Sequence, residues 1–251
     1  MQGRKIINLF LLCICSVILS SCATLPIPTS TLPPVYPPPI IRQDIVHVVA
    51  PGETLWRISR VYDVSIENIM RENSLRDRNE LEMGQKLIIP SAMPPRPVIS
   101  LYPSKKWKYI IIHHSATDVG SALNFHRAHK RRGFIHGLGY HFVIDNGSAD
   151  KPDGYIEVSP RWIKQQDGAH CKASNMNCKG IGICLVGDFT GEYVSDSQLS
   201  SLVYLVNLLR RYYRIPLSNI MGHGEVPGAN TQCPGKRFPW GEFFSRLKLN
   251  Q

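Results

Sequence analysis

The 251-residue sequence predicts an α/β fold in which helices flank a central mixed β-sheet, with a small βααβ domain before it. Two observations predict this class. After residue 107, short apolar runs alternate with helical segments, and between residues 45 and 90 two strand-like runs enclose two helical ones. Proline-rich stretches at 22–44 and 91–106 separate these regions, so we expect two folded domains, 45–90 and 107–251, joined by a linker.

The N-terminus has the composition of an export signal. Two basic residues precede an apolar run of thirteen residues (6–18), shorter than the about 20 residues that span a bilayer. The letters LSSC follow and resemble the lipobox of bacterial lipoproteins, which implies removal of residues 1–21 and lipidation of Cys22. The alternative is an ordinary signal peptide cleaved near Ser20. Residues 22–44 then form an extended tether.

The net charge leaves several classes of binding partner open, and the cysteine content leaves several disulfide pairings open. The formal net charge of +10 indicates an anionic partner, but nucleic acid, lipid surfaces and acidic wall polymers are all anionic. Four cysteines lie beyond Cys22, and in an oxidising compartment they could form two disulfides. Cys171 and Cys178, six residues apart around a loop, could close one of them, whereas Cys184 lies in an apolar run typical of a buried thiol.

The small domain begins with a strand-like run, IVHVV, followed by the turn PGE. Thr54 and Ser65 are plausible N-caps of two helices. Apolar residues at helical spacing follow each cap, and the run QKLIIP predicts a closing strand. The stretches VVAPGETLWRIS, YDVSIENIMREN and GQKLIIP together resemble the LysM module across the whole segment.

The LysM resemblance implies binding of glycans that contain N-acetylglucosamine in a shallow groove. The groove residues implied on the first strand–helix loop are Gly52, Glu53, Thr54 and Leu55, opposite the loop near Met83 and Gly84. The alternative is that Gly52 and Thr54 only form a turn and a helix cap.

The larger domain begins with three consecutive isoleucines at 110–112, a pattern typical of a strand buried on both faces. Further strands are predicted within 139–145, 154–158 and 179–189, and helices over 121–132 and 195–215. Strands that alternate with helices in this way indicate an α/β sheet.

Three residues of this domain suggest a metal site. His113 ends the isoleucine strand, His223 follows the long helix, and Cys233 comes ten residues later. Two imidazoles and a thiolate are good zinc ligands, and a catalytic zinc typically keeps three protein ligands and one water. From spacing alone, each histidine could equally be an ordinary core or surface residue.

Five separated blocks, IIIHHSAT, GYHFVID, GAH, IGICLVGDF and GHGEV…TQCPGKRFPW, resemble the type 2 N-acetylmuramoyl-L-alanine amidases, relatives of T7 lysozyme and the peptidoglycan recognition proteins. The resemblance implies a zinc hydrolase that cleaves the amide between N-acetylmuramic acid and L-alanine. It implies His113, His223 and Cys233 as zinc ligands and Tyr140 as the donor to the oxyanion. It also implies a catalytic role for Thr231, which stands where some members have lysine and many recognition proteins have threonine. The substrate cleft would include His170, Arg161 and Trp162.

The expected protein is therefore a lipid-anchored, zinc-dependent peptidoglycan amidase of the bacterial envelope with a LysM module. We expect a monomer that binds no nucleic acid, and Ala23 after Cys22 favours an outer membrane if the cell has one. A binding protein without catalysis is one alternative, and a cysteine hydrolase that uses Cys233 and His223 is another. Pro234 directly follows Cys233, and no helix begins there to lower the thiol pKa, which disfavours the cysteine hydrolase.

Overall fold

The computed structural model describes residues 41–249. The predicted signal peptide, Cys22 and most of the tether lie outside the described residues. Within 41–249, no helix combines the length and the apolar character needed to cross a membrane.

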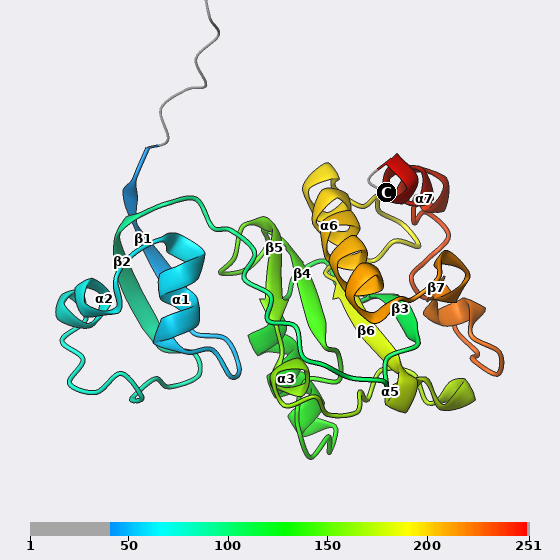
Figure 1. The fold of residues 1–251 in the computed structure, drawn as a ribbon, viewed down its shortest axis with the longest axis horizontal. Helices are drawn as coiled ribbons and strands as arrows, with labels where there is room; N and C mark the ends of the chain where they lie inside the picture. The colour runs from blue at the N-terminus through cyan, green and yellow to red at the C-terminus, as the bar shows by residue number, and fades with distance from the viewer. Residues whose placement is uncertain (1–40, 250–251) are drawn as a thin grey trace, which may run out of the picture. The chain divides into compact units, whose positions relative to one another are not determined.

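The small domain has the expected βααβ order: β1 (Gln43–Val48), α1 (Leu55–Tyr62), α2 (Ile66–Glu72) and β2 (Lys86–Ala92), in blue to cyan in Figure 1. β1 and β2 pair antiparallel. Both predicted caps are confirmed, because the Thr54 hydroxyl accepts from the Arg57 N–H and the Ser65 hydroxyl from the Asn68 N–H.

The larger domain is built on a mixed sheet, as predicted, and β7 adds a fifth strand to the four that the sequence predicts. Its strands are β3 (Tyr109–His114), β4 (Phe142–Asn146), β5 (Asp153–Val158), β6 (Gly180–Leu185) and β7 (Ile220–Gly222). The spatial order is β5-β4-β6-β3-β7; only the β4–β5 pair is antiparallel, and the other neighbours run parallel.

Helices and short turns connect the strands. α3 (Ala122–Arg131) and α6 (Asp196–Tyr213) match the predicted helices, and the hydroxyls of Ser121 and Ser195 cap them. The patterns used above do not identify the remaining elements: α4 (Pro160–Ile163), α5 (Met176–Lys179), α7 (Trp240–Leu249) and the 3₁₀ turns η1 (Ala173–Asn175), η2 (Leu217–Asn219) and η3 (His223–Glu225). Apart from α7, these elements are three or four residues long, too short for a periodic apolar pattern.

The two faces of the sheet have different roles. α6 lies along one face (Figure 1), where Ile110 and Ile112 of β3 join the main apolar core. Side chains alternate along a strand, so Ile111 and His113 point to the opposite face. Ile111 there packs in a separate small cluster with Cys171, Met176 and Val226. The alternation of β3 therefore places His113 on the face that α6 leaves uncovered.

Candidate metal centre

The register of two parallel strands brings the two histidines together. β3 pairs with β7, and Ile112 lies opposite Gly222. A histidine follows each of these two residues directly: His113 near the end of β3 and His223 at the start of η3. Carboxyl ends of parallel strands meet at one edge of a sheet, which is why residues 110 positions apart become neighbours. Their ring centroids are 4.7 Å apart.

The loop that carries Cys233 folds back against the loop of His223. The Gly224 N–H donates to the Cys233 carbonyl at 2.7 Å. A Cβ at position 224 would lie 2.5 Å from the Thr231 carbonyl oxygen, so only glycine permits this approach. The hydroxyl of the exposed Thr231 accepts from the Cys233 N–H at 3.2 Å and so helps to form the turn at Cys233.

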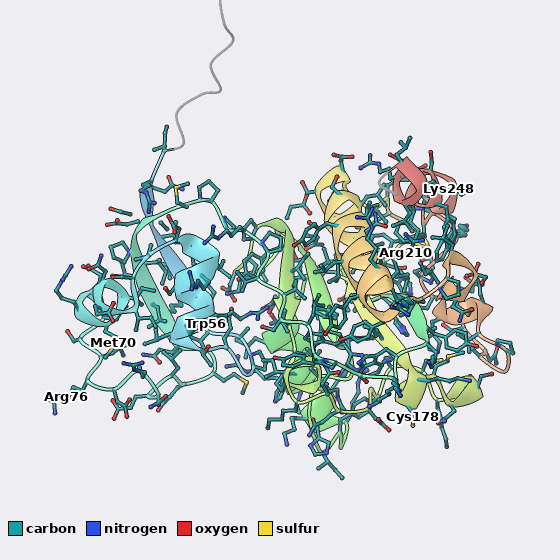
Figure 2. All side chains as sticks on the ribbon, viewed as in Figure 1. Trp56, Met70, Arg76, Cys178, Arg210 and Lys248 are labelled. Atoms are coloured by element: carbon teal, nitrogen blue, oxygen red, sulfur yellow. The ribbon has the colours of Figure 1, made fainter. Side chains whose placement is uncertain are left out.

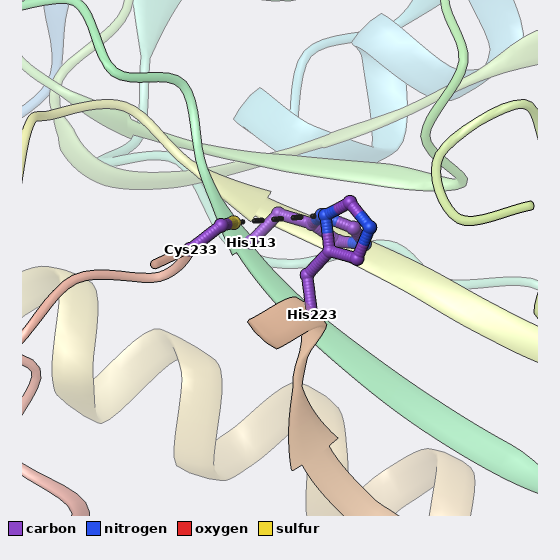
Figure 3. Close-up of side chains that lie close together, drawn as sticks. All are labelled: His113, His223 and Cys233. Carbon is purple, nitrogen blue, oxygen red and sulfur yellow. Dashed lines mark hydrogen bonds between the residues drawn. The ribbon is translucent and has the colours of Figure 1, made fainter. Parts of the chain in front are cut away.

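The side chains of His113, His223 and Cys233 converge (Figure 3), and their ligand atoms all lie within 4.8 Å of one another. His113 Nδ1 is 3.7 Å from Cys233 Sγ. Zinc bonds of about 2.0–2.3 Å in a tetrahedron separate neighbouring ligand atoms by roughly 3.3–3.6 Å. The donor set therefore fits a zinc ion with three protein ligands, and His113 Nδ1 and Cys233 Sγ already lie close to the required spacing. Among the described residues, this is the one cluster of three such side chains.

Burial sets the protonation of these groups. It lowers the pKa of His113 well below the usual range and also lowers that of His223, so both imidazoles are neutral and able to ligate. Burial raises the pKa of the Cys233 thiol to about 12. Without a bound cation the thiol stays protonated, which disfavours a cysteine nucleophile activated by His223.

Tyr140 lies beside the cluster, with its ring centroid 5.2 Å from that of His113. Burial, followed by the nearby Cys184 and Cys233, raises its pKa well above the usual range, so the phenol remains a hydrogen-bond donor at neutral pH. Cys184 pairs with His113 across β3 and β6 and is fully buried. Burial also raises the pKa of the Cys184 thiol well above the usual range, so it cannot act as a base at neutral pH.

The structure buries all three predicted cleft residues, Arg161, Trp162 and His170. The Trp162 indole is fully buried in the core, stacks on Trp107 and donates to the Ser100 carbonyl. Arg161 is 6% exposed and donates to the Leu138 and Asp167 carbonyls. Both are held by the protein itself and are unavailable to substrate, because α4 turns their side chains inward.

His170 is also buried, but next to a predicted ligand. Its Nδ1 is 3.0 Å from His113 Nε2, and its Nε2 is 3.2 Å from the Gly180 carbonyl oxygen. It therefore lies behind His113 and not on an open cleft surface.

The predicted glycan residues of the LysM loop divide into two pairs. Gly52 and Thr54 are exposed, whereas the Leu55 side chain is buried in the domain core. The Glu53 side chain is buried, with its Oε2 2.9 Å from His47 Nε2, and it also lies near Lys151, whose Nζ donates to the Val48 carbonyl at 2.6 Å. The side chains of Glu53 and Leu55 are therefore unavailable to a ligand.

Lys151 and Gly224 are the residues that sequence reasoning missed. Lys151 is 4% exposed, but nothing in its surrounding sequence distinguishes it from a surface lysine. Gly224, between His223 and Glu225, carries a weak signal, since a glycine directly after a candidate ligand often marks close backbone approach.

The hypothesised disulfide between Cys171 and Cys178 is absent, because all four cysteines of the described residues are free thiols. Cys171 is buried and its thiol points to the Ala173 carbonyl. Cys178 lies on α5 (Figure 2), where its thiol contacts the Asp167 carboxylate instead.

Comparison with known protein families decides the assignment. The family described as N-acetylmuramoyl-L-alanine amidase matches residues 103–236, more than half of the chain, and the LysM domain matches residues 47–90. The chain belongs to the N-acetylmuramoyl-L-alanine amidase family. The amidase match includes all three residues of the metal cluster, and the LysM match includes all of α1 and α2.

Individual relatives of this amidase-family chain include both enzymes and recognition proteins. Peptidoglycan-recognition protein 2 of Holotrichia diomphalia is 32% identical over 108 residues, 40% of this chain and 52% of the relative, so the chain spans about half the length of that relative. The solved N-acetylmuramoyl-L-alanine amidase LysC from Clostridium intestinale URNW is 29% identical, with a TM-score of 0.48 over 61% of this chain and 94% of its own. Drosophila PGRP-LB is 26% identical, with a TM-score of 0.41 over 52% and 76%.

Proposed function

We propose that this chain is a zinc-dependent N-acetylmuramoyl-L-alanine amidase that hydrolyses the amide between N-acetylmuramic acid and the L-alanine of peptidoglycan. The convergence of His113, His223 and Cys233 beside Tyr140 carries the proposal. A recognition protein without catalysis is the alternative. The complete donor set, together with a phenol held as a donor, favours the enzyme over this alternative.

His113 Nδ1, one ring nitrogen of His223 and Cys233 Sγ would hold the zinc. When bound, zinc supplies a water of lowered pKa and polarises a carbonyl. The residues of the chain perform the remaining tasks. The protonated Tyr140 phenol donates to the oxygen that becomes negative as the carbonyl is attacked. The His114 N–H donates to Cys233 Sγ at 3.3 Å and stabilises the thiolate that ligation requires. In this proposal Thr231 acts by shaping the Cys233 turn.

The location of the enzyme forms the second part of the proposal. Lipidation at Cys22 would anchor the monomeric chain in the bacterial envelope, on the periplasmic side of an outer membrane where one is present. The LysM loop would bind wall glycan through Gly52, Thr54 and the Glu53 backbone between them. Labelled fatty acid should be incorporated into the wild-type chain and not into Cys22→Ala, and incorporation into both would refute the anchor.

Release of stem peptides from purified cell-wall sacculi tests the catalytic proposal. The wild-type chain should release peptides, lose this activity to a chelator and regain it with zinc. Absence of release while the chain still binds sacculi would instead support the recognition protein. Release that is indifferent to the chelator would refute the zinc mechanism.

A further inference from the structure

We propose that His170 is a positioning residue that fixes the tautomer and ring orientation of His113, so that the His113 Nδ1 lone pair is aimed at the metal. The sequence places His170 on the substrate cleft, but the structure places it behind the ligand. The inference rests on the proposed zinc site and adds to it a residue outside the ligand set.

We call the chain of hydrogen bonds from the Gly180 carbonyl through His170 to His113 the relay. The Gly180 oxygen can only accept, so His170 Nε2, 3.2 Å away, carries the proton. Its other nitrogen, Nδ1, lies 3.0 Å from His113 Nε2, a distance at which one ring donates to the other. An imidazole whose single ring proton lies on Nε2 has its lone pair on Nδ1, so His170 accepts and His113 Nε2 donates. The lone pair of His113 then lies on Nδ1.

The direction of that lone pair agrees with the metal cluster. His113 Nδ1 is the atom that faces Cys233 Sγ at 3.7 Å. If the proton sat on Nδ1 instead, His113 could not ligate a metal beside Cys233, and its Nε2 lone pair would oppose that of His170. Ligating histidines usually donate their second N–H to a carboxylate, carbonyl or water. Here a second imidazole takes that place.

The surroundings of His170 hold its ring in position. The backbone N–H of His170 donates to Asn177 Oδ1 at 2.8 Å, which fixes the backbone that carries the ring. The ring packs so closely on β6 that a Cβ at position 182 would lie 2.5 Å from His170 Cγ. Gly182 therefore makes room for the relay on a strand that is otherwise apolar.

Metal affinity and tautomer state test the relay without relying on activity. His170→Asn keeps an acceptor near the Nδ1 position, whereas His170→Leu has a similar size and no acceptor. In competition with a chromophoric chelator, the Leu variant of the full chain should bind zinc 10- to 100-fold more weakly than wild type, and the Asn variant much less so. His141→Leu is the control. It removes another fully buried imidazole, one that bonds the Gly182 N–H and the Gln166 carbonyl but no ligand. It should retain zinc affinity.

Equal zinc affinity of the Leu variant and wild type, or equal losses in the Leu and Asn variants, would overturn the relay. Two-bond ¹H–¹⁵N spectra of the metal-free wild-type chain read the His113 tautomer directly and do not depend on the folding of a variant. A proton on Nε2 supports the relay, and a proton on Nδ1 overturns it. Absence of zinc binding by wild type would overturn the proposed function instead, and the tautomer would still test the relay by itself.

Discussion

Gly182→Ala is the sharpest perturbation of the site that leaves every polar group in place. The new Cβ would lie 2.5 Å from His170 Cγ, about 1 Å short of normal carbon–carbon contact. Because β6 is a buried central strand, the His170 ring must move and weaken its bonds to Gly180 and His113. Overpacking costs about 1–3 kcal/mol, and impairing a buried hydrogen bond adds about 1 kcal/mol.

A loss of about 3 kcal/mol in the free energy of unfolding corresponds to a Tm lowered by about 6–12 °C for a domain of this size. Zinc affinity should fall together with stability, by 10-fold or more, because the displaced ring no longer orients His113. Calorimetry of the metal-free chain and chelator competition measure the two effects. Gly241→Ala is the matched control, since a Cβ there has no neighbour within 4 Å and alanine suits α7. If Gly182→Ala melts and binds zinc as wild type does, the packing argument is wrong.

Four further predictions concern other residues. Cys233→Ser should lose zinc and activity together, as measured by metal analysis and peptide release. Cys178→Ser, which changes a thiol outside the cluster, should keep both, and zinc with full activity in Cys233→Ser would contradict the assignment. Tyr140→Phe should lower kcat by about 100- to 1000-fold at unchanged zinc content, and an unchanged kcat would remove Tyr140 from the mechanism. Burial alone would raise the pKa of Glu53, but His47 and Lys151 lower it to about 2, below the ordinary 4.5. The Glu53 carboxylate therefore stabilises the fold above pH 4.5, and this stabilisation is lost as the pH falls towards 2. Denaturant titrations should therefore show a smaller loss of stability over this range in Glu53→Gln than in wild type, and equal losses would contradict the assignment. At neutral pH, Lys151→Met should cost about 3 kcal/mol because it removes a cation that lies near the buried Glu53 charge.

Local patterns in the sequence predict much of the fold. Thr54 and Ser65 act through hydrogen bonds to N–H groups three residues away, so sequence spacing is sufficient to identify them as caps. The isoleucines at 110–112 predict a strand buried on both faces for a similar reason, since alternation is a local property of the backbone. α5 and β7 are too short for such patterns, and their positions depend on contacts with distant segments.

Side-chain direction is less predictable. α4 carries Arg161 and Trp162, and the sequence of this short helix does not indicate which of its sides meets the core. The structure buries both residues, so a family position near a cleft was insufficient to predict contact with substrate. Whether Cys171 and Cys178 meet is likewise a question of loop path, and the structure separates the two thiols between different partners.

The sequence by itself determined the families, the βααβ and α/β orders, and the identity of the residues His113, His223 and Cys233 as candidate ligands. These features depend on residue type and spacing along the chain. Only the tertiary structure decided that His170 lies behind His113 and that Glu53 is buried beside Lys151. The physical reason is that contacts between residues 57 or 98 positions apart, a hydrogen bond in the first case and a charge–charge interaction in the second, depend on strand register and loop path. The local sequence around either residue does not determine strand register or loop path.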